Sequence, residues 1–245
     1  MRFQLPDPRR CVRSLFGVLG TLIISISSVC AADEPRSEAA APSDDSGPPP
    51  AWLPVWDPPK QITWLSASDI SNWSFGGFAG VYNHGRLIII EVEPWRVRND
   101  WARDYMIGAN AVYKIAHLPL LPVDFELDLS VGDLVGKGNN LELGALPELR
   151  WKWFPWNKFL YTNMRWGPTG VSYTTGLSAV EASDTTHDRT SRFLNLDVFE
   201  WTFAPNDHSR WEAFIRNQHR SGIYGLINGV SGGSNYVNVG MRAHF

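Results

Sequence analysis

Most of the chain beyond residue 73 consists of segments of about ten residues in which apolar and polar side chains alternate, separated by clusters of Gly, Pro, Asn and Asp. In the segment 141–153, LELGALPELRWKW, most odd positions are apolar, whereas Glu142, Glu148, Arg150 and Lys152 occupy even positions. Residues i and i+2 of a β-strand lie on the same face. The pattern therefore predicts an all-β fold whose strands have one apolar and one charged face.

Two architectures use such strands: a soluble sandwich or barrel with a dry core, or a membrane barrel with an apolar exterior and a polar interior. Alternation alone does not separate them. Two further features favour the membrane: the chain starts with an export signal, and Trp and Tyr cluster near strand ends, as interfacial girdles require. The last segment also alternates and ends on Phe245, which is typical of bacterial outer-membrane barrels. We expect an antiparallel transmembrane β-barrel.

Residues 1–32 have the organisation of a signal peptide. A basic start precedes the apolar stretch 15–28 and the small-residue cleavage site around Ala31 and Ala32. Cys11 and Cys30 both precede this cut, so we expect no disulfide or Cys–metal site in the mature chain; a lipoprotein role of Cys30 is the alternative. Residues 33–60 are rich in Pro, Ala, Ser and Asp and predict a disordered leader before a barrel domain at 61–245. No run of about 18 apolar residues remains after the cut.

Nine segments of the barrel domain are candidate strands: 73–83, 86–97, 105–116, 124–134, 141–154, 158–168, 191–204, 209–223 and 235–245. Single-chain bacterial barrels have an even number of strands. We prefer eight, with the first two segments forming one irregular element, because 86–97 does not divide into two faces. The alternative is ten, with QITWLSA (61–67) as the additional strand.

The segment 209–222, SRWEAFIRNQHRSG, places His219 and Ser221 on its more apolar face. If Phe245 ends at the periplasmic side, both residues lie at the level of the outer leaflet and face lipid. An imidazole beside a serine hydroxyl activates it as a nucleophile, and residues i and i+2 of a strand project side by side. Asn235, on the last strand, is the best placed third group; an amide can orient the imidazole but cannot neutralise its cation. Asp197 and Glu200 are the nearby carboxylates.

The His-x-Ser pair, the Gly- and Asn-containing loop after it and the short last strand ending in Phe resemble the PagL-type lipid A 3-O-deacylases, as do the stretches AGVYNHG and RNQHRSG. This resemblance implies an eight-stranded barrel that hydrolyses the ester-linked acyl chain at the 3-position of lipid A with a Ser-His-Glu triad and no metal or cofactor. It implies Ser221 as nucleophile and His219 as general base. The acid of the family falls on Asn235, which departs from the pattern. Backbone N–H groups of Gly222 or Gly225 are candidates for an oxyanion hole.

Expected partners follow from this interpretation. They are lipid A or lipopolysaccharide, the cell outer membrane, and the barrel assembly machinery through Phe245. A net charge of −3 argues against nucleic acid. The alternatives are an ordinary polar pair in a non-enzymatic barrel with a structural or adhesive role, or a catalytically decayed relative. Side chains of the segment EASDTTHD are a weaker candidate for a divalent-cation site, against a solvated extracellular loop: Glu181, Asp184, His187 and Asp188.

Overall fold

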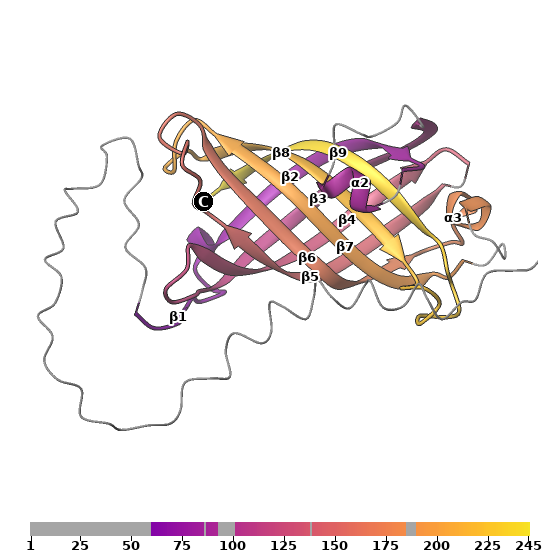
Figure 1. The fold of residues 1–245 in the computed structure, drawn as a ribbon, viewed down its shortest axis with the longest axis horizontal. Helices are drawn as coiled ribbons and strands as arrows, with labels where there is room; N and C mark the ends of the chain where they lie inside the picture. The colour runs from indigo at the N-terminus through magenta and orange to yellow at the C-terminus, as the bar shows by residue number, and fades with distance from the viewer. Residues whose placement is uncertain (1–59, 86, 93–100, 138, 185–189) are drawn as a thin grey trace, which may run out of the picture. The chain divides into compact units, whose positions relative to one another are not determined.

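The structure, a computed structural model, describes residues 60–85, 87–92, 101–137, 139–184 and 190–245 (Figure 1). The expected signal peptide and nearly all of the expected leader lie outside the described residues. No helix in the described part of the chain is long and apolar enough to cross a membrane. The elements, in chain order, are β1 (Thr63–Trp64), η3 (Ile70–Asn72), β2 (Trp73–Asn83), α2 (Leu87–Val92), β3 (Trp101–His117), β4 (Val123–Val135), β5 (Asn140–Trp151), β6 (Tyr161–Thr174), α3 (Ala179–Asp184), β7 (Phe193–Ala204), β8 (Trp211–Ser221) and β9 (Gly233–His244).

Eight strands, β2 to β9, form a closed antiparallel barrel. Each strand pairs with the next along the chain, and β9 pairs back with β2, with Ser74 opposite His244. Closure leaves no unpaired sheet edge, which is the condition for strands to cross a bilayer. The eight strands have 11 to 17 residues, enough to span the apolar layer of a membrane. The preferred count of eight barrel strands is confirmed.

The distribution of apolar and charged side chains is the reverse of that in a soluble protein. Large apolar residues project outward and are exposed, among them Leu129, Leu143, Ile215, Val239 and Met241. Charged residues fill the interior and are buried, among them Glu126, Glu148, Arg165, Arg216 and Arg242. A soluble sandwich would show the reverse, so this distribution excludes that alternative. The expected fold class, a transmembrane antiparallel β-barrel, is confirmed.

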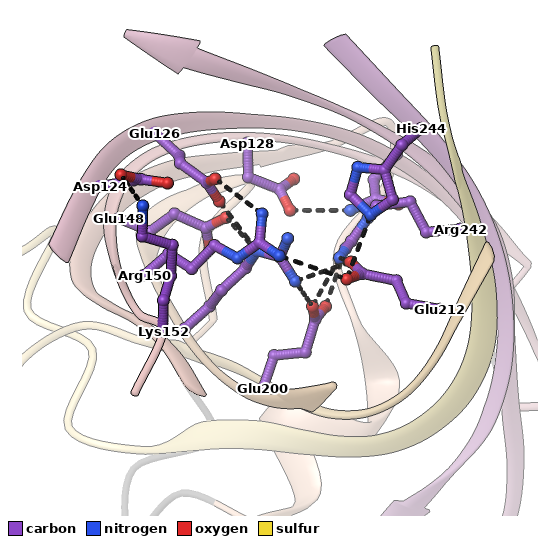
Figure 2. A network of polar contacts seen from close by, with 12 residues as sticks. Asp124, Glu126, Asp128, Glu148, Arg150, Lys152, Glu200, Glu212, Arg242 and His244 are labelled. Atoms are coloured by element: carbon purple, nitrogen blue, oxygen red, sulfur yellow. Dashed lines mark hydrogen bonds and ion pairs between the residues drawn. The ribbon is translucent and has the colours of Figure 1, made fainter. Parts of the chain in front are cut away.

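The interior combines a network of ion pairs with buried apolar clusters, one of them around Tyr82, Met106 and Phe214. Figure 2 shows Glu200 and Glu212 pointing toward Arg242, whose Nη1 lies 2.7 Å from Glu200 Oε1 and 2.8 Å from Glu212 Oε1. Arg165 is likewise within 3.0 Å of Glu126, Glu200 and Glu212. Glu142, Glu148 and Arg150, which occupy even positions of the segment 141–153, are all buried there. In the described part of the chain, side chains therefore fill the interior of this small barrel.

Aromatic rings group at the end of the barrel that carries the C-terminus. Phe245 meets Phe75 edge to face at 5.6 Å, and Trp73 stacks on Tyr113 at 5.0 Å. In Figure 1 the C-terminus and the β8–β9 loop lie at opposite ends of the barrel. The rings fit the expected interfacial girdle, since amphipathic aromatic residues prefer the boundary between lipid and water.

Three strand predictions need correction. The described part of the segment 86–97 forms α2 rather than a strand, because its run of Leu and Ile does not alternate with polar residues. At the end of β2, the side chain of Asn83 accepts a hydrogen bond from the Gly85 N–H at 2.7 Å. QITWLSA contributes only the two residues of β1, which pair with β3 and do not form a barrel strand. β6 begins and ends later than the predicted segment 158–168, since a register shift between Gly167 and Gly170 interrupts its alternation.

Candidate active site

His219 and Ser221 lie on the outward face of β8, at the end of the barrel opposite Phe245. The even-numbered residues from Glu212 to Arg220 are buried in the interior, whereas Trp211, Ala213 and Ile215 are exposed on the outside. The face and the end predicted for the pair are thus those observed. Asn217, on the same outward face, is nevertheless buried because α2 contacts β8 there.

Asn235 lies directly opposite His219 on β9, and the two side chains are hydrogen-bonded. The distance from His219 Nδ1 to Asn235 Oδ1 is 2.8 Å. The other end of the amide, Nδ2, donates to the backbone carbonyl of Gly85 at 2.8 Å. A carbonyl oxygen only accepts hydrogen bonds, so Gly85 fixes which end of the amide points toward the imidazole.

The orientation of the amide determines the tautomer of His219. Because Asn235 presents an oxygen, the imidazole must donate through an Nδ1–H. In the neutral ring the second nitrogen, Nε2, is then unprotonated and available as a base. Asn235 therefore orients the imidazole as a triad carboxylate would, but it carries no negative charge to stabilise the imidazolium.

Ser221 follows two residues after His219 on the same face, and its side chain is partly exposed. Among the residues that the structure describes, its hydroxyl has no hydrogen-bond partner, so the oxygen is free to meet a substrate. Gly233 lies opposite Ser221 on β9. A Cβ at Gly233 would fall 2.9 Å from His219 Cε1 and 3.1 Å from Ser221 Cβ, so the absence of a side chain there makes room for both.

Of the two carboxylates expected near His219, only Asp197 reaches the site. Asp197 is the cross-strand partner of His219 on β7. Glu200 instead faces the interior and binds Arg165 and Arg242, because it lies an odd number of positions from Asp197 along the strand.

A third carboxyl, Glu91 of α2, was missed by the sequence analysis because its segment was interpreted as a strand. Asn217 Nδ2 donates to Glu91 Oε1 at 3.1 Å. Burial, reinforced by the neighbouring charge of Asp197, raises the pKa of Glu91 to about 7, against the opposing effect of the Asn217 hydrogen bond. Glu91 therefore joins α2 to the barrel wall through a carboxyl group that titrates near neutral pH.

The expected oxyanion donors are already occupied in the β8–β9 loop. The Gly222 N–H donates to the carbonyl of Gly232 at 3.4 Å, and the Gly225 N–H donates to that of Val230 at 2.9 Å. The loop is tightly folded: Ile223, Tyr224 and Asn228 all have positive φ. The prediction that Gly222 or Gly225 offers a free N–H is therefore wrong for this conformation.

The first acid of the candidate cation segment, Glu181, does not lie in a solvated loop. Glu181 is buried in α3, where it is ion-paired with Arg220 and accepts hydrogen bonds from Ser234 at 3.0 Å and Thr190 at 2.6 Å. Arg220 points into the end of the barrel, where its buried charge needs an opposite charge beside it, and Glu181 supplies that charge. His187 and Asp188 lie outside the described residues, as does the side chain of Asp184. Within the described ranges, no group of three or more His, Cys, Asp or Glu side chains is arranged to hold a metal ion.

A closed barrel of eight antiparallel strands, apolar outside and charged inside, defines the class of the protein: a transmembrane β-barrel with a Ser, His and Asn cluster at one end of its outer face. No protein-family model matches the sequence, and no curated protein does. Solved structures of similar fold include the outer-membrane enzyme PagL, with 11% identity, a TM-score of 0.48, and coverage of 70% of this chain and 99% of PagL. Neisserial surface protein A has 9% identity, a TM-score of 0.39, and coverage of 71% and 96%. Ail of Yersinia pestis has 9% identity, a TM-score of 0.30, and coverage of 69% and 99%.

Proposed function

We propose that the protein is an outer-membrane hydrolase that removes an ester-linked acyl chain, at the 3-O position, from lipid A. The observation that carries the proposal is the hydrogen bond of 2.8 Å from His219 Nδ1 to Asn235 Oδ1, on the same outward face as Ser221. It leaves His219 Nε2 as a base two residues from a serine hydroxyl without a partner in the described part of the chain.

The position on the barrel supports a lipid as substrate. The cluster faces outward, where acyl chains of the surrounding bilayer lie, and a lipid ester would reach it without leaving the membrane. With Phe245 at the periplasmic end, the cluster lies in the outer leaflet, which holds lipid A in Gram-negative cells. Phe245 is exposed and sits at the end of β9, as a signal read by the barrel assembly machinery would be.

The proposed reaction has two halves. Ser221 Oγ attacks the ester carbonyl carbon while His219 Nε2 takes the hydroxyl proton. The bond from the carbonyl carbon to the sugar oxygen then breaks, and that oxygen takes the proton from His219. Water attacks the acyl-serine with the same base assistance, which releases the fatty acid and restores the Ser221 hydroxyl. Asn235 holds the ring in one tautomer throughout.

A second candidate, a non-enzymatic barrel or a decayed relative of such an enzyme, is favoured by one specific observation. Position 235 carries an amide where a triad has a carboxylate, and an amide does not compensate the charge of an imidazolium. Under this alternative the hydrogen bond between His219 and Asn235 only ties β8 to β9.

Expression in a Gram-negative host followed by mass spectrometry of its lipid A separates the two candidates. The hydrolase predicts a species lighter by one acyl chain with the wild-type protein and its absence with Ser221→Ala. Ser231→Ala, at an exposed serine of the neighbouring loop, is the matched control and should retain the light species. Unchanged lipid A with correctly folded wild-type protein in the membrane would favour the non-enzymatic barrel.

A further inference from the structure

We propose that Asp197 supplies the negative charge that the site lacks at position 235, acting on His219 from β7. The inference rests on the proposed hydrolase function and assigns Asp197 as a positioning residue for its base. The missing carboxylate would then be relocated from the strand after His219 to the strand before it.

The register of the barrel places Asp197 opposite His219. Asp197 and His219 are directly opposed on β7 and β8, and His219 and Asn235 are directly opposed on β8 and β9. Opposed residues have Cβ atoms about 4.5–5.5 Å apart and project from the same face. The imidazole thus stands in a row of three strands, with a neutral acceptor on one side and a carboxyl group on the other.

No side chain in the described part of the structure holds the carboxyl group of Asp197 by a hydrogen bond. Its Oδ1 is buried and has no hydrogen-bond partner among the described residues, where Asp197 also forms no ion pair. Buried acceptors are nearly always satisfied, because an unmade hydrogen bond destabilises the fold. The carboxylate is therefore free to act on a neighbouring charge, and His219, opposite it on β8, gains a positive charge during the proposed reaction.

Among the residues that the structure describes, few other charges surround His219. Glu91 of α2 is the second carboxyl on this side, and its Oε1 is engaged by Asn217. β9 contributes the uncharged amide of Asn235, and the arginines of β8, Arg216 and Arg220, point into the barrel. Because the outward face borders lipid, an opposite charge beside the imidazolium is weakly screened and stabilises the protonated ring.

The first test needs no activity. In the folded full chain in detergent micelles, the ring protons of His219 are titrated by NMR and assigned by comparison with His219→Gln. Asp197→Asn should move the titration midpoint of His219 to lower pH by about one unit, as expected for loss of an adjacent opposite charge. Asp133→Asn, which removes an exposed outward carboxylate on β4 at the same end of the barrel, should leave it in place. An unmoved midpoint in folded Asp197→Asn would overturn the proposal.

The second test uses the pH profile of acyl release. Asp197→Asn should lower the plateau of kcat/KM and move its acid limb to lower pH, while Asp197→Glu restores both in part. A purely structural role of Asp197 would lower the plateau and leave the limb unmoved. If the wild type and Ser221→Ala both lack activity, the hydrolase itself fails and the NMR result alone decides on the pairing. If Ser221→Ala is inactive and Asp197→Asn matches the wild type, only the role of Asp197 fails.

Discussion

The side chains of His219 and Asn235 face each other across β8 and β9 and are joined by a hydrogen bond of 2.8 Å. A third group, the Gly85 carbonyl, determines that His219 Nδ1 is the donor in this bond. The Gly85 carbonyl accepts from the Asn235 amide and so turns its oxygen toward the imidazole. In serine hydrolases, exchanging the triad carboxylate for an amide lowers kcat by about 10⁴-fold because the amide favours the wrong tautomer. Here the Gly85 carbonyl selects the productive tautomer, and the charge that position 235 lacks is the one assigned to Asp197.

Restoring the charge at position 235 should therefore raise activity. We expect Asn235→Asp to increase kcat for acyl release by about tenfold or more, since the carboxylate both accepts from Nδ1 and compensates the imidazolium. Steady-state kinetics of the purified protein measures the change. Asn139→Asp adds the same charge at an exposed turn of the same barrel end and should have no effect. A lower kcat in the folded Asn235→Asp variant would mean that the contact to Gly85 matters more than the charge.

Gly233 should be intolerant of a side chain. A Cβ there would meet the Arg220 carbonyl at 2.3 Å as well as the ring of His219, so Gly233→Ala must displace β8 or the imidazole. We predict loss of acyl release with a barrel that still folds at reduced stability, measured by the heat-dependent shift of the folded band on gels. Gly77→Ala on β2 is the control, because its Cβ would have no neighbour closer than 3.8 Å. Full activity of Gly233→Ala would show that the observed spacing of the site is not required.

The docking of α2 should depend on pH through Glu91. The pKa of Glu91 is about 7 in the folded protein and lies above the ordinary value of 4.5, so the protonated form favours docking. Its contribution is complete below about pH 4.5 and is lost as the pH rises through about 7. Hydrogen exchange of residues 87–92, corrected for the intrinsic pH effect, should therefore accelerate across this window.

Glu91→Gln tests the assignment of that pH dependence. The substituted amide keeps a hydrogen-bonding group toward Asn217 and cannot ionise, so exchange of α2 should become independent of pH between 5 and 8. Persistence of the wild-type pH dependence would assign it to another group, with Asp197 the nearest.

The interior network predicts a large cost for removing one of its cations. Arg165 is fully buried and lies within 4 Å of four carboxylates: Glu126, Glu148, Glu200 and Glu212. Arg165→Met leaves these charges uncompensated, and breaking a buried pair in this way destabilises by about 3–5 kcal/mol. Urea unfolding in lipid bilayers measures the free energy. Arg103→Met, at an exposed position of β3, should change it little, and an equal loss in both variants would refute the network as the main source of stability.

The sequence predicts the fold well wherever alternation is regular. β8 and β9 alternate over most of their length, so the outward face that carries His219, Ser221 and Asn235 follows from strand geometry. The register that sets His219 opposite Asn235 depends on the loop between the strands and comes from the structure. Prediction fails where the period is interrupted. The run of Leu and Ile in α2 has no polar face to reveal, and Pro168 between Gly167 and Gly170 shifts the register of β6.

The contacts that complete the site could not be predicted from local pattern. The Gly85 carbonyl reaches Asn235 across 150 residues of chain, and Glu91 reaches Asn217 across 126. Both come from the β2–β3 connection, whose path depends on how α2 packs against the finished barrel wall. The stretch AGVYNHG contains Gly85, but nothing in its sequence signals that the carbonyl group would orient an amide on the last strand.

Acyl release from lipid A by the purified, folded protein in detergent tests the central claim most directly. Mass spectrometry of both products should show lipid A lighter by one acyl chain and an equimolar amount of free fatty acid, with the rate reduced by about 10³-fold or more in Ser221→Ala. The same release by wild type and Ser221→Ala, or no release by a wild-type barrel shown to be folded, would contradict the assignment of Ser221 and His219 as nucleophile and base.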